Sequence, residues 1–282
     1  MLNAKLFTNI NVHREAADWH NRVLSNGGRV SKDTLRAVSN FCYRIDAANI
    51  RDKLLRLNLF CGNSLESCLV PLYRGESLTA TQHGNATDTN YNFISTDYVE
   101  RGSTGGLKGN GSSKYLDTGF AANILTQTDR HLSLWWDMTT NLFNRHFFGI
   151  DNNACTPPSP ASTVWWSMGT NSTTQIQFRC STSSTQGTAN TSGKIHFLLS
   201  GNGTAQSYLN GATSTSLSLT AFTASSQSVF IFTINRCGAP PASGGYGSSR
   251  HGPYSIGKSM NSTQALDFYN SILLFQTELS RN

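Results

Sequence analysis

Charged residues are scarce in this sequence, and one long stretch contains no glutamate. Of the 282 residues only 13% are charged, and no Glu occurs between positions 101 and 277. A glycoside hydrolase needs two carboxyl groups that flank the bond it cleaves, yet the aspartates here stand singly: Asp117, Asp129, Asp137, Asp151 and Asp267. The sequence also lacks a nucleophile elbow, a phosphate-binding glycine loop and an H-E-x-x-H motif. We expect no enzymatic activity and no cofactor, although distant aspartates could converge, so hydrolysis stays the least favoured function.

Patterns for metal binding and for a disulfide framework are missing as well. The six cysteines include no C-x-x-C pair and no histidine at zinc-ligand spacing. Asp151-Asn152-Asn153 is a possible set of oxygen ligands, but a turn in which these side chains bond the backbone is favoured. We therefore predict no metal site, and free thiols at Cys42, Cys61, Cys68, Cys155, Cys180 and Cys237.

Long apolar runs are also missing. The longest falls far short of the roughly 20 residues that span a bilayer, and the first residues lack the continuous apolar core of a signal peptide. From these absences we expect a protein that lies outside membranes and is not exported by the usual route.

Positive charge exceeds negative charge only near the start. The formal net charge is +6, and residues 1–75 hold 11 Lys and Arg against 6 Asp and Glu, whereas residues 76–282 hold 11 against 10. Arg44, Arg51 and Arg56 are spaced as on the outer face of helices, so a solvated face is favoured over a phosphate track. Aromatic residues do not alternate with these cations, as a single-strand binder would require. A nucleic-acid partner is therefore not expected.

The first 75 residues differ from the rest in composition and period. They hold only 7 of the 65 Ser and Thr residues, which places a boundary near residue 75. Apolar residues at helical spacing predict one-sided helices that must pack on something else. The first covers 14–25, the second is capped by Ser31 or Asp33, and the third passes through Ile50, Leu54 and Leu57.

Beyond residue 76 the apolar period becomes two. In 131–138, Leu132, Leu134, Trp136 and Met138 share one face, which predicts a half-buried strand. Residues 183–193 are expected to form a polar loop, and Asn-Gly pairs suit hairpin turns. This spacing favours a sandwich or barrel. Further strands are predicted at 145–150, 163–168, 175–180, 194–199, 206–209 and 228–234.

The last residues return to a helical period. Asn261 and Gln264 approximate a capping box, and Ala265, Phe268 and Ile272 follow along one face. We expect a helix, although residues 271–275 are short enough to form a strand, so both types stay open.

Three short motifs carry a resemblance to a known superfamily. They are Tyr115-Leu116-Asp117-Thr118-Gly119, Tyr208-Leu209-Asn210-Gly211 and Tyr254-Ser255-Ile256-Gly257-Lys258. In this order they resemble the concanavalin A-like, laminin G-like jelly rolls. The resemblance covers about 107–282 and implies a mainly β fold, an antiparallel jelly-roll sandwich preceded by a short helical region. Residues 76–106 would then be a linker with the first strands.

The first hundred residues resemble the helical leader of bacteriophage and prophage structural proteins. The resemblance lies in Trp19, in 26–31, in 51–62 and in Val70-Pro71-Leu72-Tyr73-Arg74-Gly75. It implies a virion component assembled in the host cytoplasm, whose residues 1–75 act as an anchor or oligomerisation arm. Its partners would be other capsid or tail proteins and further copies of itself, a trimer being one option. A fold shared by lectins, hydrolases and structural modules does not assign a function by itself.

Candidate contact residues follow from the alternation of side chains along the predicted strands. Trp135 and Trp165 are expected on strand faces opposite Trp136 and Trp166, where each could pack on its own chain, contact a subunit or bind a glycan. Our leading hypothesis is a non-enzymatic virion structural protein, for capsid decoration or at the tail. The alternative is a carbohydrate-binding module for host-surface glycans. Weaker contact candidates are Tyr246 and His251, and the anchor would use Trp19, Arg44, Arg51 and Arg56.

Overall fold

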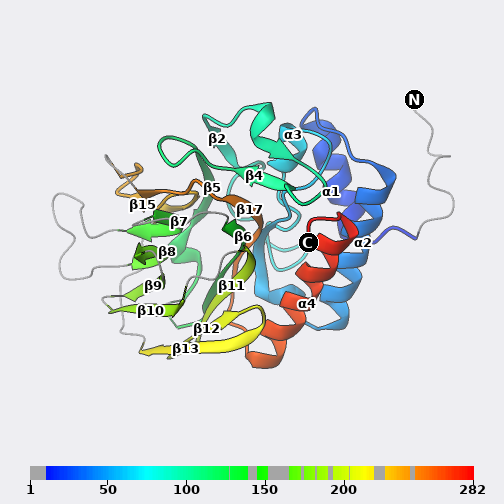
Figure 1. Cartoon of the computed structure of the whole chain (residues 1–282). Coiled ribbons are helices and arrows are strands. Elements are labelled where there is room, and N and C mark those ends of the chain that lie inside the picture. The colour runs from blue at the N-terminus through cyan, green and yellow to red at the C-terminus, as the bar shows by residue number, and fades with distance from the viewer. Residues whose placement is uncertain are drawn as a thin grey trace.

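The chain folds into two sheets that lie face to face, with helices on one side. The computed structural model describes residues 11–126, 128–138, 145–151, 165–172, 175–181, 183–189, 193–202, 204–218, 226–241 and 245–282. Figure 1 shows the helices stacked against one sheet, while the other sheet lies on the far side of the sandwich. The predicted mainly β, concanavalin A-like sandwich with a helical N-terminal region is therefore confirmed. Within the described ranges, no helix is both long and apolar enough to cross a membrane.

Sheet A carries the helical layer. Its strand order is β13-β12-β11-β6-β17-β4-β3, and β1 pairs antiparallel with β17. The bounds are β1 Leu54–Asn58, β3 Tyr98–Val99, β4 Gly106–Lys108, β6 Arg130–Met138, β11 Gly193–Asn202, β12 Thr204–Leu209, β13 Ala212–Ser218 and β17 Arg250–Gly257.

Sheet B faces sheet A across the first core. Its order is β10-β9-β8-β7-β14-β5-β2, and β15 and β16 pair parallel with β7. Inward side chains of both sheets, such as Leu116, Leu134, Trp136 and Ile231, fill the space between them. The bounds are β2 Thr89–Tyr91, β5 Tyr115–Ala121, β7 Arg145–Asp151, β8 Trp165–Ser172, β9 Gln175–Ser181, β10 Ser183–Ala189, β14 Ser228–Ile231, β15 Asn235–Arg236 and β16 Gly245–Tyr246.

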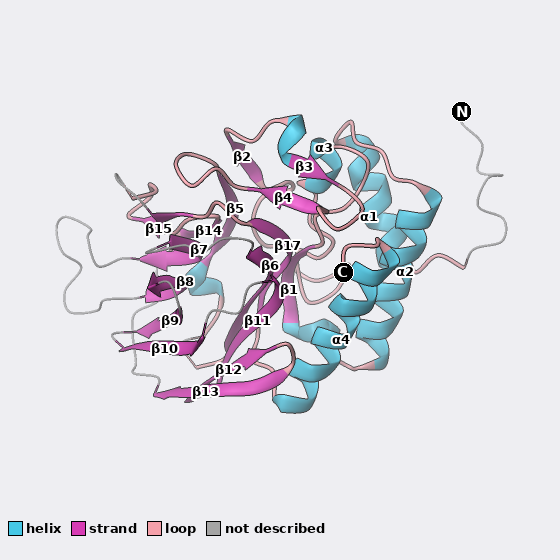
Figure 2. Ribbon diagram, in the orientation of Figure 1, coloured by secondary structure: helices cyan, strands magenta, loops and turns pink. Residues whose placement is uncertain are grey.

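The helices begin at the caps that the sequence predicts. Ser31 caps α2 and accepts from the Thr34 N–H, while Asn261 and Gln264 form the reciprocal capping box of α4. The C-terminal segment is therefore a helix, and its strand alternative is wrong. Figure 2 shows α1, α2 and α4 on the side of sheet A. The bounds are α1 Arg14–Ser25, α2 Lys32–Ala47, α3 Leu65–Cys68 and α4 Ser262–Glu278.

Two predicted elements have a different type in the structure. Ile50, Leu54 and Leu57 lie at helical spacing, but Leu54–Asn58 form β1, whose five residues are all buried. A strand covered on both faces has no polar alternation to mark its period of two. Residues 183–189, expected within a polar loop, form β10, which pairs with β9.

A second core lies between the helices and the outer face of sheet A. It joins Trp19 of α1 and Phe41 of α2 to Trp135 and Leu198 of the sheet and to Phe275 of α4. The Trp19 indole also donates to the Val70 carbonyl at 3.1 Å. Residues from both sides of the predicted boundary at residue 75 therefore pack in one core.

Arg56 lies inside the protein rather than on a solvated face. Its side chain is fully buried on β1, and it donates to Asp88 Oδ1 at 2.6 Å and to the Tyr254 hydroxyl at 3.1 Å. Asn58 donates to the other oxygen of Asp88 at 2.8 Å. The expectation of a solvated Arg56 is wrong because its segment is a covered strand and not a helix.

Arg44 and Arg51 are paired as well. Arg51 donates to Glu15 at 2.7 Å, and the Glu15 side chain is only 2% exposed. Arg44 of α2 donates to Glu278 of α4 at 3.0 Å. These contacts are within the chain, so the basic residues of the first segment stabilise the fold instead of forming a free cationic face.

The cysteines that the structure describes divide into two states, whereas Cys155 and the side chain of Cys180, also predicted as free thiols, lie outside the described residues. Cys42, Cys61 and Cys68 are buried free thiols, as predicted. Cys237 is disulfide-bonded, so the expectation of a free thiol is wrong there. A disulfide depends on the separation of two Cα atoms in space, which sequence spacing does not reveal.

Candidate functional site

Trp135 is packed within its own chain. It lies on the outer face of β6 and is only 4% exposed, because α4 covers it and Tyr269 stacks beside its ring at 6.4 Å. Trp136 lies on the inner face and stacks on Phe197 at 4.7 Å. The predicted alternation is therefore confirmed, but Trp135 as a contact for a glycan or partner is wrong.

The second predicted indole cannot be placed in the same way. Trp165 begins β8, as the sequence predicts for this segment, but its side chain lies outside the described residues. Its neighbour Trp166 is 1% exposed and belongs to the first core.

The prediction that His251 is a surface contact is also wrong. It lies inside the sandwich, fully buried, with its ring stacked on Phe232 at 3.8 Å and edge-on to Phe147 at 5.8 Å. Burial lowers the pKa of His251 to about 3, so the ring is neutral. A neutral imidazole between two phenyl rings contributes to packing.

Tyr246 lies in a cluster of tyrosines on sheet B. Its ring centroid is 6.3 Å from that of Tyr115, which stacks on Tyr91 at 4.2 Å with an interplanar angle of 5°. Phe230 lies beneath, 5.0 Å from Tyr115 and 3% exposed. Tyr91 is 40% exposed, and Tyr115 and Tyr246 are half-buried. We call Tyr91, Tyr115 and Tyr246 the tyrosine surface.

Strand pairing explains why these three rings meet. Tyr91 of β2 and Tyr115 of β5 are direct cross-strand partners. Along β5, Tyr115 and Asp117 lie on the face opposite the buried Leu116. Tyr246 arrives on β16, which runs beside β7. Tyr246 was predicted as a contact residue from the sequence, whereas Tyr91 and Tyr115 were not, although Tyr115 begins one of the three short motifs.

The hydroxyl of Tyr115 stays protonated over the physiological range. Burial, together with the neighbouring Tyr91, Tyr246 and Asp117 side chains, raises the pKa of Tyr115 to about 12. The tyrosine surface therefore presents flat rings whose hydroxyls both donate and accept hydrogen bonds.

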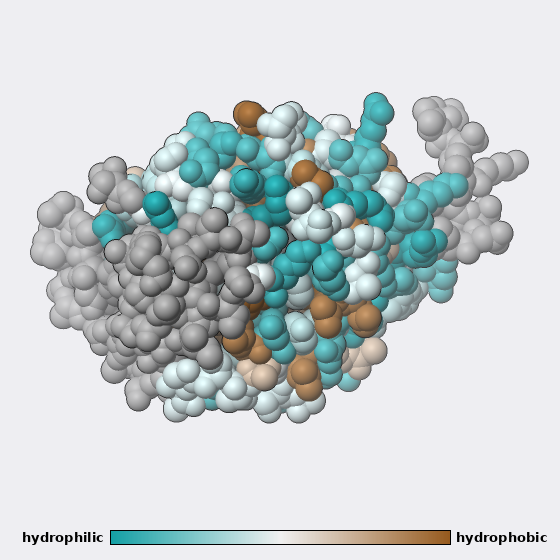
Figure 3. Space-filling view, in the orientation of Figure 1, coloured by the Kyte–Doolittle hydropathy of each residue, from teal (hydrophilic) through white to brown (hydrophobic). Residues whose placement is uncertain are grey.

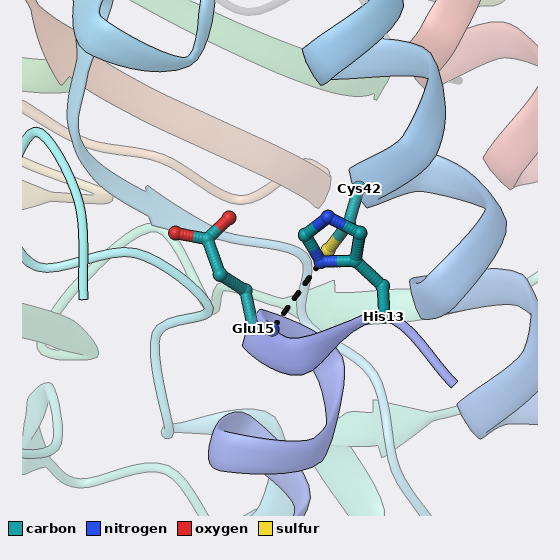
Figure 4. Close-up of side chains that lie close together, drawn as sticks. All are labelled: His13, Glu15 and Cys42. Atoms are coloured by element: carbon teal, nitrogen blue, oxygen red, sulfur yellow. Dashed lines mark hydrogen bonds between the residues drawn. The ribbon is translucent and has the colours of Figure 1, made fainter. Parts of the chain in front are cut away.

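A buried group of metal-ligating residues lies far from this surface, at the start of α1. The ligand atoms of His13, Glu15 and Cys42 lie within 4.8 Å of one another (Figure 4). His13 Nδ1 accepts from the Glu15 N–H at 3.2 Å, and its Nε2 is 2.9 Å from Asp46. Figure 4 shows the His13 ring above the Cys42 sulfur and the Glu15 carboxylate turned away.

The side chains of this group already have partners within the chain. The Glu15 carboxylate is bound by Arg51. Burial raises the pKa of the Cys42 thiol to about 12, so the thiol is protonated when no ion is bound. His13 is the N-terminal cap of α1, and Asp46 holds the other nitrogen of its ring.

Three of the single aspartates accept hydrogen bonds from nearby groups among the described residues. Asp151 on sheet B is buried and bound by Arg236 at 3.0 Å. Asp129 accepts from the Ser259 N–H and hydroxyl, at 2.7 and 2.6 Å, beside sheet A. Asp117 accepts from the Gly119 N–H. Asp117 and Asp151 lie on β5 and β7 of sheet B, and Asp129 lies just before β6, so each of the three serves local hydrogen bonds.

The helical side offers no broad apolar face in the view of Figure 3. Brown atoms are scattered among teal and white ones on the coloured part of this face. The exposed apolar residues of α4, Leu266 and Leu274, are 45% and 48% exposed. Single exposed leucines are ordinary on protein surfaces.

Comparisons with known proteins bear on the fold. No family model matches the chain, and no curated protein matches it. Among solved structures it is similar to a Trypanosoma rangeli sialidase mutant displaying trans-sialidase activity, with TM-score 0.50 and 12% identity over 86% of this chain and 39% of that one. It is also similar to the binding domain of botulinum neurotoxin serotype D, with TM-score 0.51 and 12% identity over 79% of this chain and 52% of that one. The chain thus spans about two fifths of the sialidase and half of the neurotoxin domain, and at these identities the likeness shows the fold alone.

Proposed function

We propose that this chain is a non-enzymatic binding module whose tyrosine surface binds a glycan. The observation that carries the proposal is the stacked pair of Tyr91 and Tyr115 with Tyr246 beside it, partly open to solvent on the sheet that carries no helical layer. An aromatic ring packs against the apolar face of a sugar, and the tyrosine hydroxyl bonds the sugar's own hydroxyls. His146, the register partner of Tyr246, adds a polar group nearby.

Binding is favoured over hydrolysis by the state of the carboxylates. Asp151 at the end of β7 and Asp129 just before β6 are each committed to local partners. A hydrolase would hold two carboxyl groups about 5–10 Å apart across the substrate. The fold likeness is compatible with either function, so the tyrosine surface carries the argument.

Single tyrosine variants test this proposal. We expect the full-length protein to be retained by a subset of glycans on an array, and Tyr91→Ala and Tyr246→Ala to weaken that binding about tenfold, as for an aromatic contact in other interfaces. Tyr43→Ala is the matched control, because Tyr43 is 43% exposed on α2, against 40% for Tyr91. Absence of any retained glycan, or an equal loss in the control, would contradict the proposal.

A role in the virion, as capsid decoration or tail component, is our second proposal. It rests on the sequence, and one structural arrangement supports it: the helices and sheet B lie on opposite sides of the sandwich (Figure 1). A particle contact through the helices would leave the tyrosine surface outward. Cys237 is disulfide-bonded, and such bonds persist on virion and cell surfaces. Electron microscopy of purified particles with an antibody against this chain tests the location.

A further inference from the structure

A polar groove lies on the other side of the molecule, between β12 and the start of α4. Its volume is about 430 Å³, within the range of about 300–1,000 Å³ that small-molecule sites span. Six of its lining residues define the site: Lys53, Gln206, Tyr208, Met260, Asn261 and Gln264. The groove belongs to sheet A and the helical layer, so it is separate from the tyrosine surface on sheet B.

The floor of the groove is apolar with one free hydroxyl. Tyr208 and Met260 are 5% and 4% exposed and belong to the second core. Ser200 fixes Met260, since its hydroxyl donates to the Met260 carbonyl at 2.8 Å and accepts from the Met260 N–H at 2.7 Å. Among the described residues the Tyr208 hydroxyl makes no hydrogen bond, although Tyr208 lines the groove. This hydroxyl meets the groove and can bond a ligand there.

The walls supply amide groups that are held in place. Gln206 donates to the Thr215 carbonyl at 2.9 Å and accepts from Ser216 at 2.8 Å. Asn261 and Gln264 are fixed by the capping box of α4. Because these amides are oriented before a ligand arrives, little side-chain entropy is lost on binding.

The lining carries a single charge, and it is positive. Lys53 is the cation, and no carboxylate lines the groove. Lys53 Nζ forms an ion pair with Asp52 at 3.7 Å, but the Asp52 side chain is 59% exposed and lies outside the lining, so the pair is weak. The first turn of the 17-residue helix α4 adds a partial positive charge at the same wall. The field in the groove therefore favours an anionic group.

We infer that this groove binds an acidic monosaccharide, a sugar ring that carries one carboxylate. The apolar face of the ring packs on Tyr208 and Met260. Its hydroxyls bond the amide group of Gln264 and the side-chain oxygen of Gln206, whose nitrogen already donates to the Thr215 and Ser207 carbonyls. The carboxylate pairs with Lys53. The inference does not depend on the proposed function of the tyrosine surface.

Nuclear magnetic resonance titration of the full chain tests the site. The probes are glucuronic acid and glucose, which differ in whether a carboxylate or a hydroxymethyl group is attached to the ring. We expect glucuronate to shift amide signals of residues 204–208 and 259–264, and glucose to bind about tenfold more weakly. Lys53→Gln should lower the affinity for glucuronate about tenfold and leave the affinity for glucose unchanged. The control Lys108→Gln, at an exposed lysine, should change neither affinity.

Two further variants separate the possible outcomes. Tyr208→Phe removes only the hydroxyl, and we expect weaker binding of both sugars with an unchanged melting temperature. Tyr91→Ala should leave the groove response intact, which distinguishes it from glycan binding on sheet B. Equal affinity for glucose and glucuronate would overturn the role of the carboxylate, and absence of shifts in the groove with either sugar would overturn the site.

Discussion

His131, His196 and His251 are fully buried, and two of them belong to one row of hydrogen bonds beneath α4. His131 Nε2 is 2.8 Å from the Ser255 hydroxyl, which is 3.0 Å from that of Ser133, and His196 Nε2 is 3.3 Å from Ser133. The row includes serine and histidine at catalytic distances, but the helical layer covers it. It therefore connects β17, β6 and β11 rather than acting on a substrate.

The charge state of these histidines makes stability depend on pH. Burial lowers the pKa of His131 to about 4 and that of His196 and His251 to about 3, whereas a histidine in the unfolded chain has a pKa of about 6.5. As the pH falls below 6.5 the unfolded state takes up protons that the native state does not. The free energy of unfolding then falls between pH 6.5 and 4, by up to about 1.4 kcal/mol per pH unit for each histidine.

His251→Phe tests this linkage at one residue. Neither ring nitrogen of His251 has a partner among the described residues, and both ring neighbours are phenylalanines. We expect the variant to be as stable as the parent or more stable at pH 7, and its pH dependence between 6.5 and 5 to be about one third smaller. Urea unfolding across this range measures both. An unchanged slope would show that His251 does not remain neutral in the fold.

For single residues, the sequence predicts which face of a strand a side chain lies on better than it predicts which other residues cover that side chain. Period-two spacing correctly places Trp135 opposite Trp136. The cover over Trp135 comes from Tyr269, far along the chain, so its burial could not be read locally. Arg56 was misread for the same reason, because its partners Asp88 and Tyr254 come from other segments.

Among elements, β1 shows how the second core is attached to the sandwich. β1 pairs with β17, and Gly257 of β17 lies opposite Leu54. A Cβ at Gly257 would meet the Lys53 carbonyl oxygen and come within 2.9 Å of the His131 ring. The close approach of the two backbones therefore requires glycine at this position.

Gly257→Ala should separate β1 from the sheet. We expect it to be at least twice as destabilising as Gly102→Ala, the control. Gly102 has a positive φ of +83°, but nothing lies within 4 Å of its would-be Cβ, so alanine there costs only about 1–2 kcal/mol of backbone strain. Thermal unfolding of the two variants makes the comparison. If both variants lose the same thermal stability, the contact between β1 and Gly257 adjusts to a methyl group without destabilising the fold.

The helices could be predicted where caps and apolar stripes agree. The stop at Asn26-Gly27-Gly28 and the pair of Asn261 and Gln264 mark real helix ends. β1 and β10 lack such signals, since one is buried throughout and the other consists of polar and small residues. Both depend on pairing with a distant or adjacent strand, which local patterns do not record.

At the scale of the whole molecule, two cores share sheet A. One fills the sandwich, and the other lies between sheet A and the helices. The candidate site on sheet B could be predicted only in part, through Tyr246. Tyr91 and Tyr115 meet because β2 pairs with β5, and nothing near either residue in the sequence indicates that contact.

Removal of residues 1–75 tests whether the sandwich is stable without its helical layer. The deletion takes away α1, α2, α3 and β1, and it exposes Trp135 and Leu198. Asp88 also loses Arg56 and Asn58 and keeps the Tyr254 hydroxyl as a side-chain donor, so the deletion breaks a buried ion pair. We expect residues 76–282 alone to show no cooperative thermal transition and no fixed near-ultraviolet circular dichroism signal.

Co-expression of residues 1–75 and 76–282 as separate chains tests whether the two parts fold together. Because residues 1–75 and 76–282 meet across an apolar core and a paired strand, the separate chains should associate into a soluble complex with a single transition. A cooperatively folded 76–282 fragment would contradict this expectation and make the first 75 residues a detachable arm. If instead residues 76–282 fold only in association with residues 1–75, the helices belong to the core that stabilises sheet A. Any contact made through the helices would then depend on that core.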